Sequence, residues 1–196
     1  MDTCFKERMI FLFVLQFGYL TRLFSENVDT VNAASSVGSH FIVNNLLHTA
    51  FVLLFVHSHF IWAEVILVVN FINLSSLYFR HNKYPRSIHT PVVSGPLSWT
   101  FVALYWNGAI MVHHQDGLIA RIFGNVFIWS ILAYGLFFLA IYNDYTMGLS
   151  LSVLAAAIGV GQFLTHAVAL QWIFAFVIMG VLFLATLGVA VPVWTG

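Results

Sequence analysis

In the stretch Asn70-Phe-Ile-Asn-Leu-Ser-Ser-Leu-Tyr-Phe-Arg80 an apolar helix ends in aromatic and basic side chains. A polar connection follows over residues 80–96, and a second apolar segment begins at Pro96. Proline suits the first turn of a helix, where its missing N–H would have no partner. The stretch therefore predicts two apolar helices separated by a loop over residues 80–96.

Charged residues are scarce throughout the chain. They make up 7% of its 196 residues, whereas 61% are hydrophobic. A water-soluble domain carries roughly 25% charged residues, so this composition predicts a protein whose partner is the lipid bilayer. Seven basic and seven acidic residues cancel. With no net positive charge, the chain has no long-range electrostatic field to attract nucleic acid, and we expect no nucleic-acid partner.

Seven segments are apolar enough to cross a membrane, which takes about 20 residues of helix. They are residues 9–24, 36–56, 60–79, 97–112, 118–142, 147–164 and 170–193. The joints between most of them are short, as at His57-Ser58-His59, so neighbouring helices are expected to run antiparallel. The predicted fold is all-α, a polytopic transmembrane helical bundle of about seven spans that forms one integral membrane domain over residues 1–196.

Basic residues near the span ends indicate the orientation in the membrane. Cytosolic loops carry an excess of Lys and Arg. Three basic residues fall on one side and four on the other, and the densest group lies between Arg80 and Arg86. The loop over residues 80–96 is therefore predicted to face the cytosol, together with the carboxyl terminus.

Several short motifs resemble a family of fungal multi-pass membrane proteins that is classified only as a domain of unknown function. The motifs are VGSH at 37–40, NNLLH at 44–48, NLSSLYFRH at 73–81, PVVSGPLSW at 91–99, YWNG at 105–108, DYTMG at 144–148 and GVGQFLT at 159–165. The resemblance extends from about Phe17 to the carboxyl terminus and implies an integral membrane protein without an established activity. Members of that family carry a further hydrophobic segment upstream, which would bring both chain ends to the cytosolic side.

Polar side chains inside the predicted spans are the candidate lining of a cavity. His40, Asn44 and His48 recur every four residues and share one face of a helix. Such a stripe lines a cavity or forms hydrogen bonds to amides of other helices, each contributing about 0.6 to 2 kcal/mol. The full set of cavity candidates is His40, Asn44, His48, Glu64, Asn70, Asn73, Asn107 and Gln162.

Glu64 is the one carboxylate within a predicted span. Ionisable groups in a bilayer are costly and usually face a partner or a water-filled cavity. Glu64 is therefore a proton or cation site, or it reaches from near the helix end toward water, which its position favours.

Histidines at the polar turns form the only candidate metal set. His57, His59, His113, His114 and His166 are predicted to lie at one membrane face, where imidazoles bind zinc or copper or respond to acid. Histidine is also common at polar turns, and no ligand spacing supports a site. Only His48 is deep enough for haem, which needs two axial ligands at matching depth. We expect no cofactor.

Small residues in the predicted span over residues 147–164 indicate close helix packing. Ala155 with Gly159, and Ala157 with Gly161, form two small-x-x-x-small pairs. Such a face packs within the chain or against a membrane-protein partner or a second copy.

Two functions follow from these patterns. The first is an integral membrane protein that handles a small molecule or ion through an intramembrane polar cavity. The alternative is a structural or assembly factor that acts through helix-packing faces and has no substrate. No phosphate-binding loop, catalytic triad order or zinc-peptidase helix occurs in the sequence, which argues against an enzyme.

Overall fold

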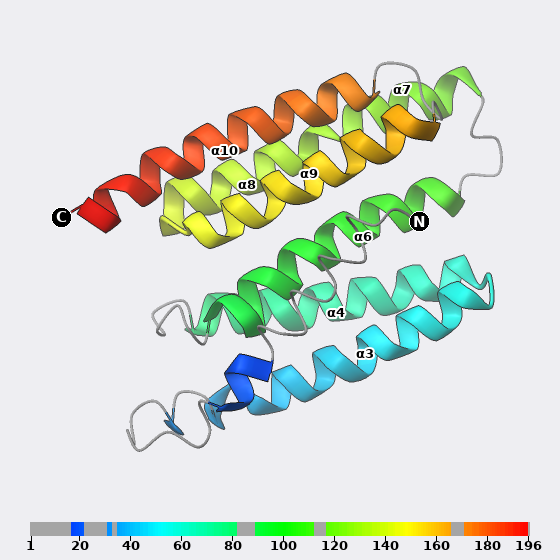
Figure 1. Cartoon of the computed structure of the whole chain (residues 1–196). Helices are drawn as coiled ribbons and strands as arrows, with labels where there is room; N and C mark the ends of the chain where they lie inside the picture. Colours follow the sequence, from blue (N-terminus) through cyan, green and yellow to red (C-terminus); the bar gives the residue numbers. More distant parts are fainter. Residues whose placement is uncertain are drawn as a thin grey trace. The chain divides into compact units, whose positions relative to one another are not determined.

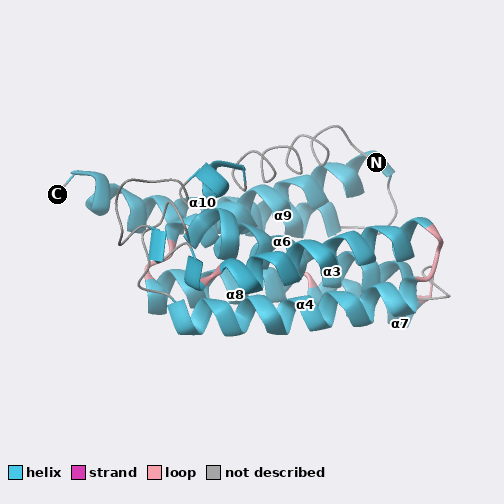
Figure 2. Cartoon of the chain, turned by 90° about the horizontal axis from the view of Figure 1, so that it is seen from below, coloured by secondary structure: helices cyan, strands magenta, loops and turns pink. Residues whose placement is uncertain are grey.

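The computed structural model describes residues 17–21, 31–32, 35–81, 89–111, 117–165 and 171–195. These residues are almost entirely helical and include no strand, which confirms the all-α prediction (Figure 2). Contacts divide the chain into two compact units, Met1–Asn107 and Gly108–Gly196, here called the amino-terminal unit and the carboxyl-terminal unit.

The amino-terminal unit is built on an antiparallel helix pair. Its helices are α3 (Gly38–Val56), α4 (Phe60–His81), a π-helical turn η1 (Thr90–Ser94) and α6 (Gly95–Met111), whose last residues belong to the second unit. Helices α3 and α4 lie side by side along their whole length (Figure 1).

A three-residue turn joins α3 to α4. His57 N donates to Leu53 O at 3.1 Å, and His59 N donates to Leu54 O at 2.9 Å, which satisfies carbonyls at the end of α3. Ser58 has φ 59°, the left-handed conformation that commonly ends a helix. The turn predicted at these residues is confirmed, and it forces α3 and α4 to run in opposite directions.

The connection between α4 and α6 is shorter than the predicted loop over residues 80–96. Helix α4 continues to His81, and helical structure resumes before Pro96. Residues 82–88 lie outside the described residues. Val92 and Val93 are 0% and 1% exposed, and η1 contacts α4. Pro91 and Pro96 do not prevent helical structure here, because proline is tolerated in a first helical turn. Burial of the two valines stabilises the turn against α4.

The carboxyl-terminal unit contains helices that pack lengthwise. They are α7 (Leu118–Phe127), α8 (Trp129–Tyr142), α9 (Tyr145–Thr165) and α10 (Gln171–Thr195). The single helix predicted over residues 118–142 is interrupted at Ile128, where Ile131 N donates to Ile128 O at 3.1 Å in a tighter turn. Ile128 keeps right-handed helical dihedrals, so the chain continues in nearly the same direction.

Glycines allow α8, α9 and α10 to approach closely. A Cβ added at Gly135 would lie 2.5 Å from Leu182 of α10, and one added at Gly148 would overlap the hydroxyl of Thr186. Ser152 Oγ also donates to Met179 O at 3.0 Å, which links α9 directly to the α10 backbone. Among the described helices, α9 and α10 make the most extensive contact.

The turn between α8 and α9 has a defined start and end. Asn143 ends α8 with φ 51°, a left-handed conformation that asparagine tolerates. Asp144 Oδ1 accepts hydrogen bonds from Thr146 N at 3.0 Å and Met147 N at 3.1 Å, so its carboxylate caps the first turn of α9.

Within the described ranges, five of the predicted spans form helices that are long and apolar enough to cross a membrane. They are Gly38–Val56, Phe60–Arg80, Arg121–Tyr142, Tyr145–Leu164 and Gln171–Val193. The segment predicted over residues 97–112 forms α6, which has 17 residues. Of the segment predicted over residues 9–24, only residues 17–21 are described, and these are helical.

Candidate functional site

Polar side chains link α3, α4 and α6 at three positions along the amino-terminal unit. On α4 these positions are marked by Asn73, Asn70 and Glu64, in order of approach to the α3–α4 turn. We call them the end layer, the middle layer and the turn layer. Each layer contains at least one candidate that the sequence singled out.

The end layer joins α3 to α4 by two hydrogen bonds. His40 Nδ1 lies 2.7 Å from Asn73 Oδ1, and Asn73 Nδ2 donates to His40 O at 3.3 Å. Because an amide oxygen only accepts, His40 carries the Nδ1 proton in this arrangement. Both functional groups of the Asn73 amide are thereby used by the same α3 residue.

The middle layer is the most deeply buried. Asn70 Nδ2 donates to Asn44 Oδ1 at 3.0 Å and lies 3.5 Å from Thr100 Oγ1, while Thr100 Oγ1 donates to Pro96 O at 2.8 Å. Asn70 and Asn44 are 2% and 4% exposed. Asn70 Oδ1 is buried and accepts no hydrogen bond from the described part of the chain. This layer therefore has an unused acceptor.

The turn layer joins α4 to α6. Asn107 Nδ2 donates to Glu64 Oε2 at 2.8 Å and to Phe60 O at 3.0 Å. Asn107 is fully buried, whereas Glu64 is half-buried. The Glu64 carboxylate is therefore turned toward α6 and bonded there, although Glu64 is only the fifth residue of α4.

His48 lies one helical turn from Asn44 on the same face of α3. Its ring is half-buried, with centroid distances of 6.2 Å to Phe51 and 6.4 Å to Trp99. The imidazole makes no hydrogen bond to any residue that the structure describes. Its predicted role in lining a cavity stays a prediction.

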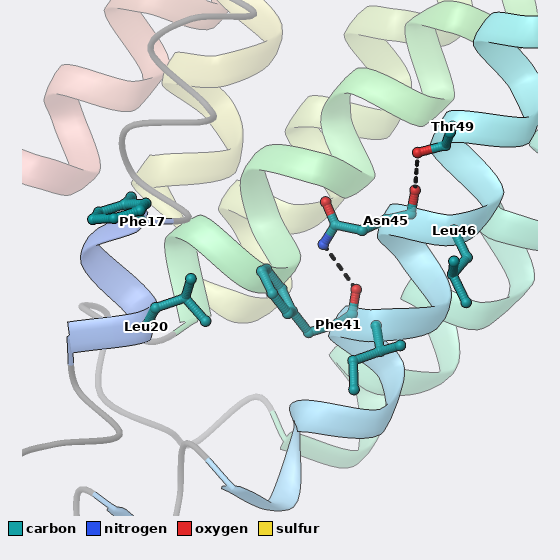
Figure 3. A pocket seen from close by; sticks show the side chains of 7 residues that line it. Phe17, Leu20, Phe41, Asn45, Leu46 and Thr49 are labelled. Atoms are coloured by element: carbon teal, nitrogen blue, oxygen red, sulfur yellow. Dashed lines mark hydrogen bonds between the residues drawn. The ribbon is translucent and has the colours of Figure 1, made fainter.

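An apolar groove lies on the outer side of α3, which the sequence reasoning missed (Figure 3). Its volume is about 410 Å³, and its lining is Phe17, Leu20, Phe41, Ile42, Asn45, Leu46 and Thr49. Its polar side chains bond to their own helix: Asn45 Nδ2 donates to Phe41 O, and Thr49 Oγ1 to Asn45 O, both at 2.9 Å. The i, i+4 spacing of Asn45 and Thr49 was the sequence pattern that could have drawn attention to this side of α3. None of the predicted cavity residues lines this groove.

The carboxyl-terminal unit contains one cavity candidate, Gln162, which is half-buried near the end of α9. Its Oε1 is buried and accepts no hydrogen bond from the described residues, and the same is true of Asn125 Oδ1 on α7. Near this end of the unit, Gln171 Nε2 donates to Gly124 O at 3.3 Å. Reasoning from the sequence did not pair these amides with one another.

The predicted small-residue pairs occupy different environments on α9. Ala155 is buried, and a Cβ at Gly159 would lie 3.2 Å from the Phe176 ring of α10. Ala157 and Gly161 are half-exposed. The tightest glycine contacts of the described residues are instead at Gly135 and Gly148, outside both predicted pairs.

Of the five histidines proposed as metal ligands, only His57 and His59 are described, and both are exposed in the α3–α4 turn. His113, His114 and His166 lie outside the described residues. Within the described ranges, no three His, Cys, Asp or Glu side chains form a group able to hold a metal ion.

The fold thus defines an all-α protein with several helices able to span a membrane and with polar contacts between them. Residues 121–196 match the family described as "Fungal protein of unknown function (DUF1774)". This match confirms the predicted resemblance to a fungal family of unknown function over residues 121–196.

A curated homologue is an uncharacterized protein of Schizosaccharomyces pombe, 37% identical over 91 residues. The aligned part is 46% of this chain and 32% of the yeast protein, so the chain spans about a third of that relative. No solved structure matches the chain.

Proposed function

We propose that this chain is a multi-pass integral membrane protein that handles a small polar molecule or an ion at the middle layer. In this proposal α3, α4 and α6 form the wall of an intramembrane site. The connection between α4 and α6 faces the cytosol, as its basic residues favour.

Exposed apolar side chains support insertion into a membrane. Leu46, Trp62 and Leu184 are 66%, 66% and 69% exposed, and they stand among many other large apolar side chains on the helix surfaces. Soluble monomers rarely expose contiguous apolar patches of more than a few hundred Å². Hydrocarbon chains of lipid satisfy these surfaces without cost, which suits the small number of charged residues.

The observation that carries the functional part of the proposal is the unused acceptor of Asn70. A buried polar atom without a partner costs about 1–3 kcal/mol. Asn70 lies close to the midpoint of α4, and Asn44 and His48 lie close to the midpoint of α3. A small molecule or water that donates a hydrogen bond to Asn70 Oδ1 removes this cost, and substrate sites of many transporters lie at the bilayer midplane.

Cysteine accessibility tests whether the middle layer is reached from water. The chain would be expressed in membranes with Cys4→Ser and Asn70→Cys, then exposed to a small methanethiosulfonate ammonium reagent. Leu74→Cys is the matched control, because Leu74 is also buried and lies one turn away on α4. We expect Asn70→Cys to react at least tenfold faster than the control. Equal rates would remove the support for a cavity.

The alternative function, a structural or assembly factor, is favoured by the end layer, in which His40 and Asn73 satisfy one another. A partner face would lie on α10, where Gly180 has no neighbouring atom within 4 Å of an added Cβ. A protein that co-purifies with the chain and is lost in Gly180→Ile would support this alternative. Gly159→Ile is unsuitable for the test, because Gly159 already packs on Phe176.

A further inference from the structure

We propose that the turn layer binds a monovalent positive charge at Glu64, as Na⁺ or as a proton. This inference rests on the proposed function and deepens it: the molecule handled at the middle layer is a cation or enters together with one. The layer adjoins the α3–α4 turn, so the charge enters from that end of the unit.

The position of the carboxylate is the first support. Glu64 lies within the candidate span Phe60–Arg80, and its Oε2 accepts a hydrogen bond from the fully buried Asn107. A carboxylate that only avoided lipid would extend toward water. This one instead points into a helix interface, where an ionised group needs a partner.

The described residues of the amino-terminal unit place no Lys or Arg beside Glu64. Arg80 is the one Lys or Arg among the described residues of the amino-terminal unit, and it lies at the opposite end of α4. Sixteen residues of α-helix separate the two, roughly 24 Å. Among the described residues of this unit Glu64 has no cationic partner, and in our proposal a cation from solution supplies the neutralising charge.

Oxygen atoms suited to a hard cation are present in the turn layer. The Glu64 carboxylate offers two oxygens, and Phe60 O lies within reach of the same Asn107 amide. Carboxylate and carbonyl oxygens are the preferred ligands of such ions. A proton on Glu64 gives the same neutral group, which is why the two charge carriers must be separated by experiment.

Helix α6 connects the turn layer to the middle layer. Thr100 and Asn107 are seven residues apart, which places them on nearly the same face of the helix. They are separated by roughly 10 Å along its axis. Occupation of Glu64 thereby acts on the same α6 face that borders Asn70.

The experiment measures the thermal stability of the full chain in detergent or nanodiscs. Melting would be followed in NaCl and in choline chloride of equal ionic strength, at pH 5 and pH 8. With Na⁺ at ten times its Kd, we expect NaCl to raise the Tm of the wild type by about 3 °C at pH 8. If the carrier is a proton, Na⁺ has no effect and the Tm changes with pH.

Glu64→Gln is the central variant, because it keeps an acceptor for Asn107 and removes the charge. If the carrier is Na⁺, we expect this variant to lose the response of the Tm to Na⁺. If the carrier is a proton, we expect it to lose the part of the pH response that comes from Glu64. His57 and His59, the other titratable groups at this end among the described residues, are present in both proteins and cancel in the comparison. Glu64→Asp, which keeps the charge, should retain part of the response.

Equal responses of wild type and Glu64→Gln to both Na⁺ and pH would overturn the inference. Asn70→Leu alters only the middle layer, so its melting response to Na⁺ and pH separates this outcome from failure of the proposed function. If Asn70→Cys proves inaccessible while Glu64→Gln loses its response, the cation site stands without the cavity.

Discussion

Alanine at Gly148 should destabilise the carboxyl-terminal unit, whereas alanine at Gly180 should not. A Cβ at Gly148 would overlap Thr186 Oγ1 and lie 2.8 and 2.9 Å from the two methyl groups of Leu139. At Gly180 no atom lies within 4 Å of an added Cβ. Gly148 lies in the first turn of α9 and Gly180 in the interior of α10, so the gain in helix propensity is no larger at Gly148 than at Gly180.

The expected magnitudes follow from two opposing terms. Overpacking a core typically costs 1–3 kcal/mol, roughly the range we assign to Gly148→Ala. Replacing a helical glycine by alanine gains up to about 1 kcal/mol at either site. Because the propensity gain is no larger at Gly148, the difference between the two variants should be at least about 1–3 kcal/mol in favour of Gly180→Ala.

Unfolding of both variants in mixed micelles, followed by circular dichroism, measures this difference directly. Thr186→Ala should relieve part of the strain in Gly148→Ala, so the double mutant should be more stable than the sum of the single changes predicts. Equal stability of Gly148→Ala and Gly180→Ala would refute the proposed close approach of α9 and α10.

Two further changes test local contacts. Replacing Asn73 with leucine removes both hydrogen bonds to His40 and should lower the free energy of unfolding by about 1–2 kcal/mol. The control Asn45→Leu loses a hydrogen bond within its own helix and should have little effect. Equal losses in the same unfolding assay would argue against the end layer. Asp144→Ala removes the cap of α9 and should lower the free energy of unfolding by about 1 kcal/mol, whereas Asp144→Asn should keep most of the capping contribution. An unchanged Tm for the alanine variant would contradict the capping role.

The pairing of α3 with α4 is largely predictable from the sequence. The spacing of His40 and Asn44 fixes one face of α3, and the tight turn after Val56 fixes the direction of α4. Two antiparallel helices joined this way bring residues at similar distances from the turn to within about one helical turn of the same level. His40 opposite Asn73, and Asn44 opposite Asn70, follow from that geometry.

The partners of α6 and the glycine contacts are not predictable in the same way. The connection between α4 and α6 leaves the register of α6 open, so sequence alone could not match Asn107 with Glu64. A small-x-x-x-small pattern says how closely a helix can approach another, but not which residue meets it. Among the described glycines, the closest contacts to neighbouring helices lie at Gly135 and Gly148, whereas the pattern drew attention to Ala155 and Gly159.

The π-helical turn Thr90–Ser94 has a consequence for insertions and deletions in this protein. Its wider winding accommodates a residue that an α-helical turn would not, and such turns act as local adjustments of helical phase. Adding or removing one residue between this turn and Thr100, where no wider turn absorbs the change, would rotate the rest of α6 by about 100° relative to the buried valines of η1. Thr100 and Asn107 would then face away from Asn70 and Glu64. The number of residues between the buried valines and Thr100, as much as their identity, sets which side of α6 is presented to α4.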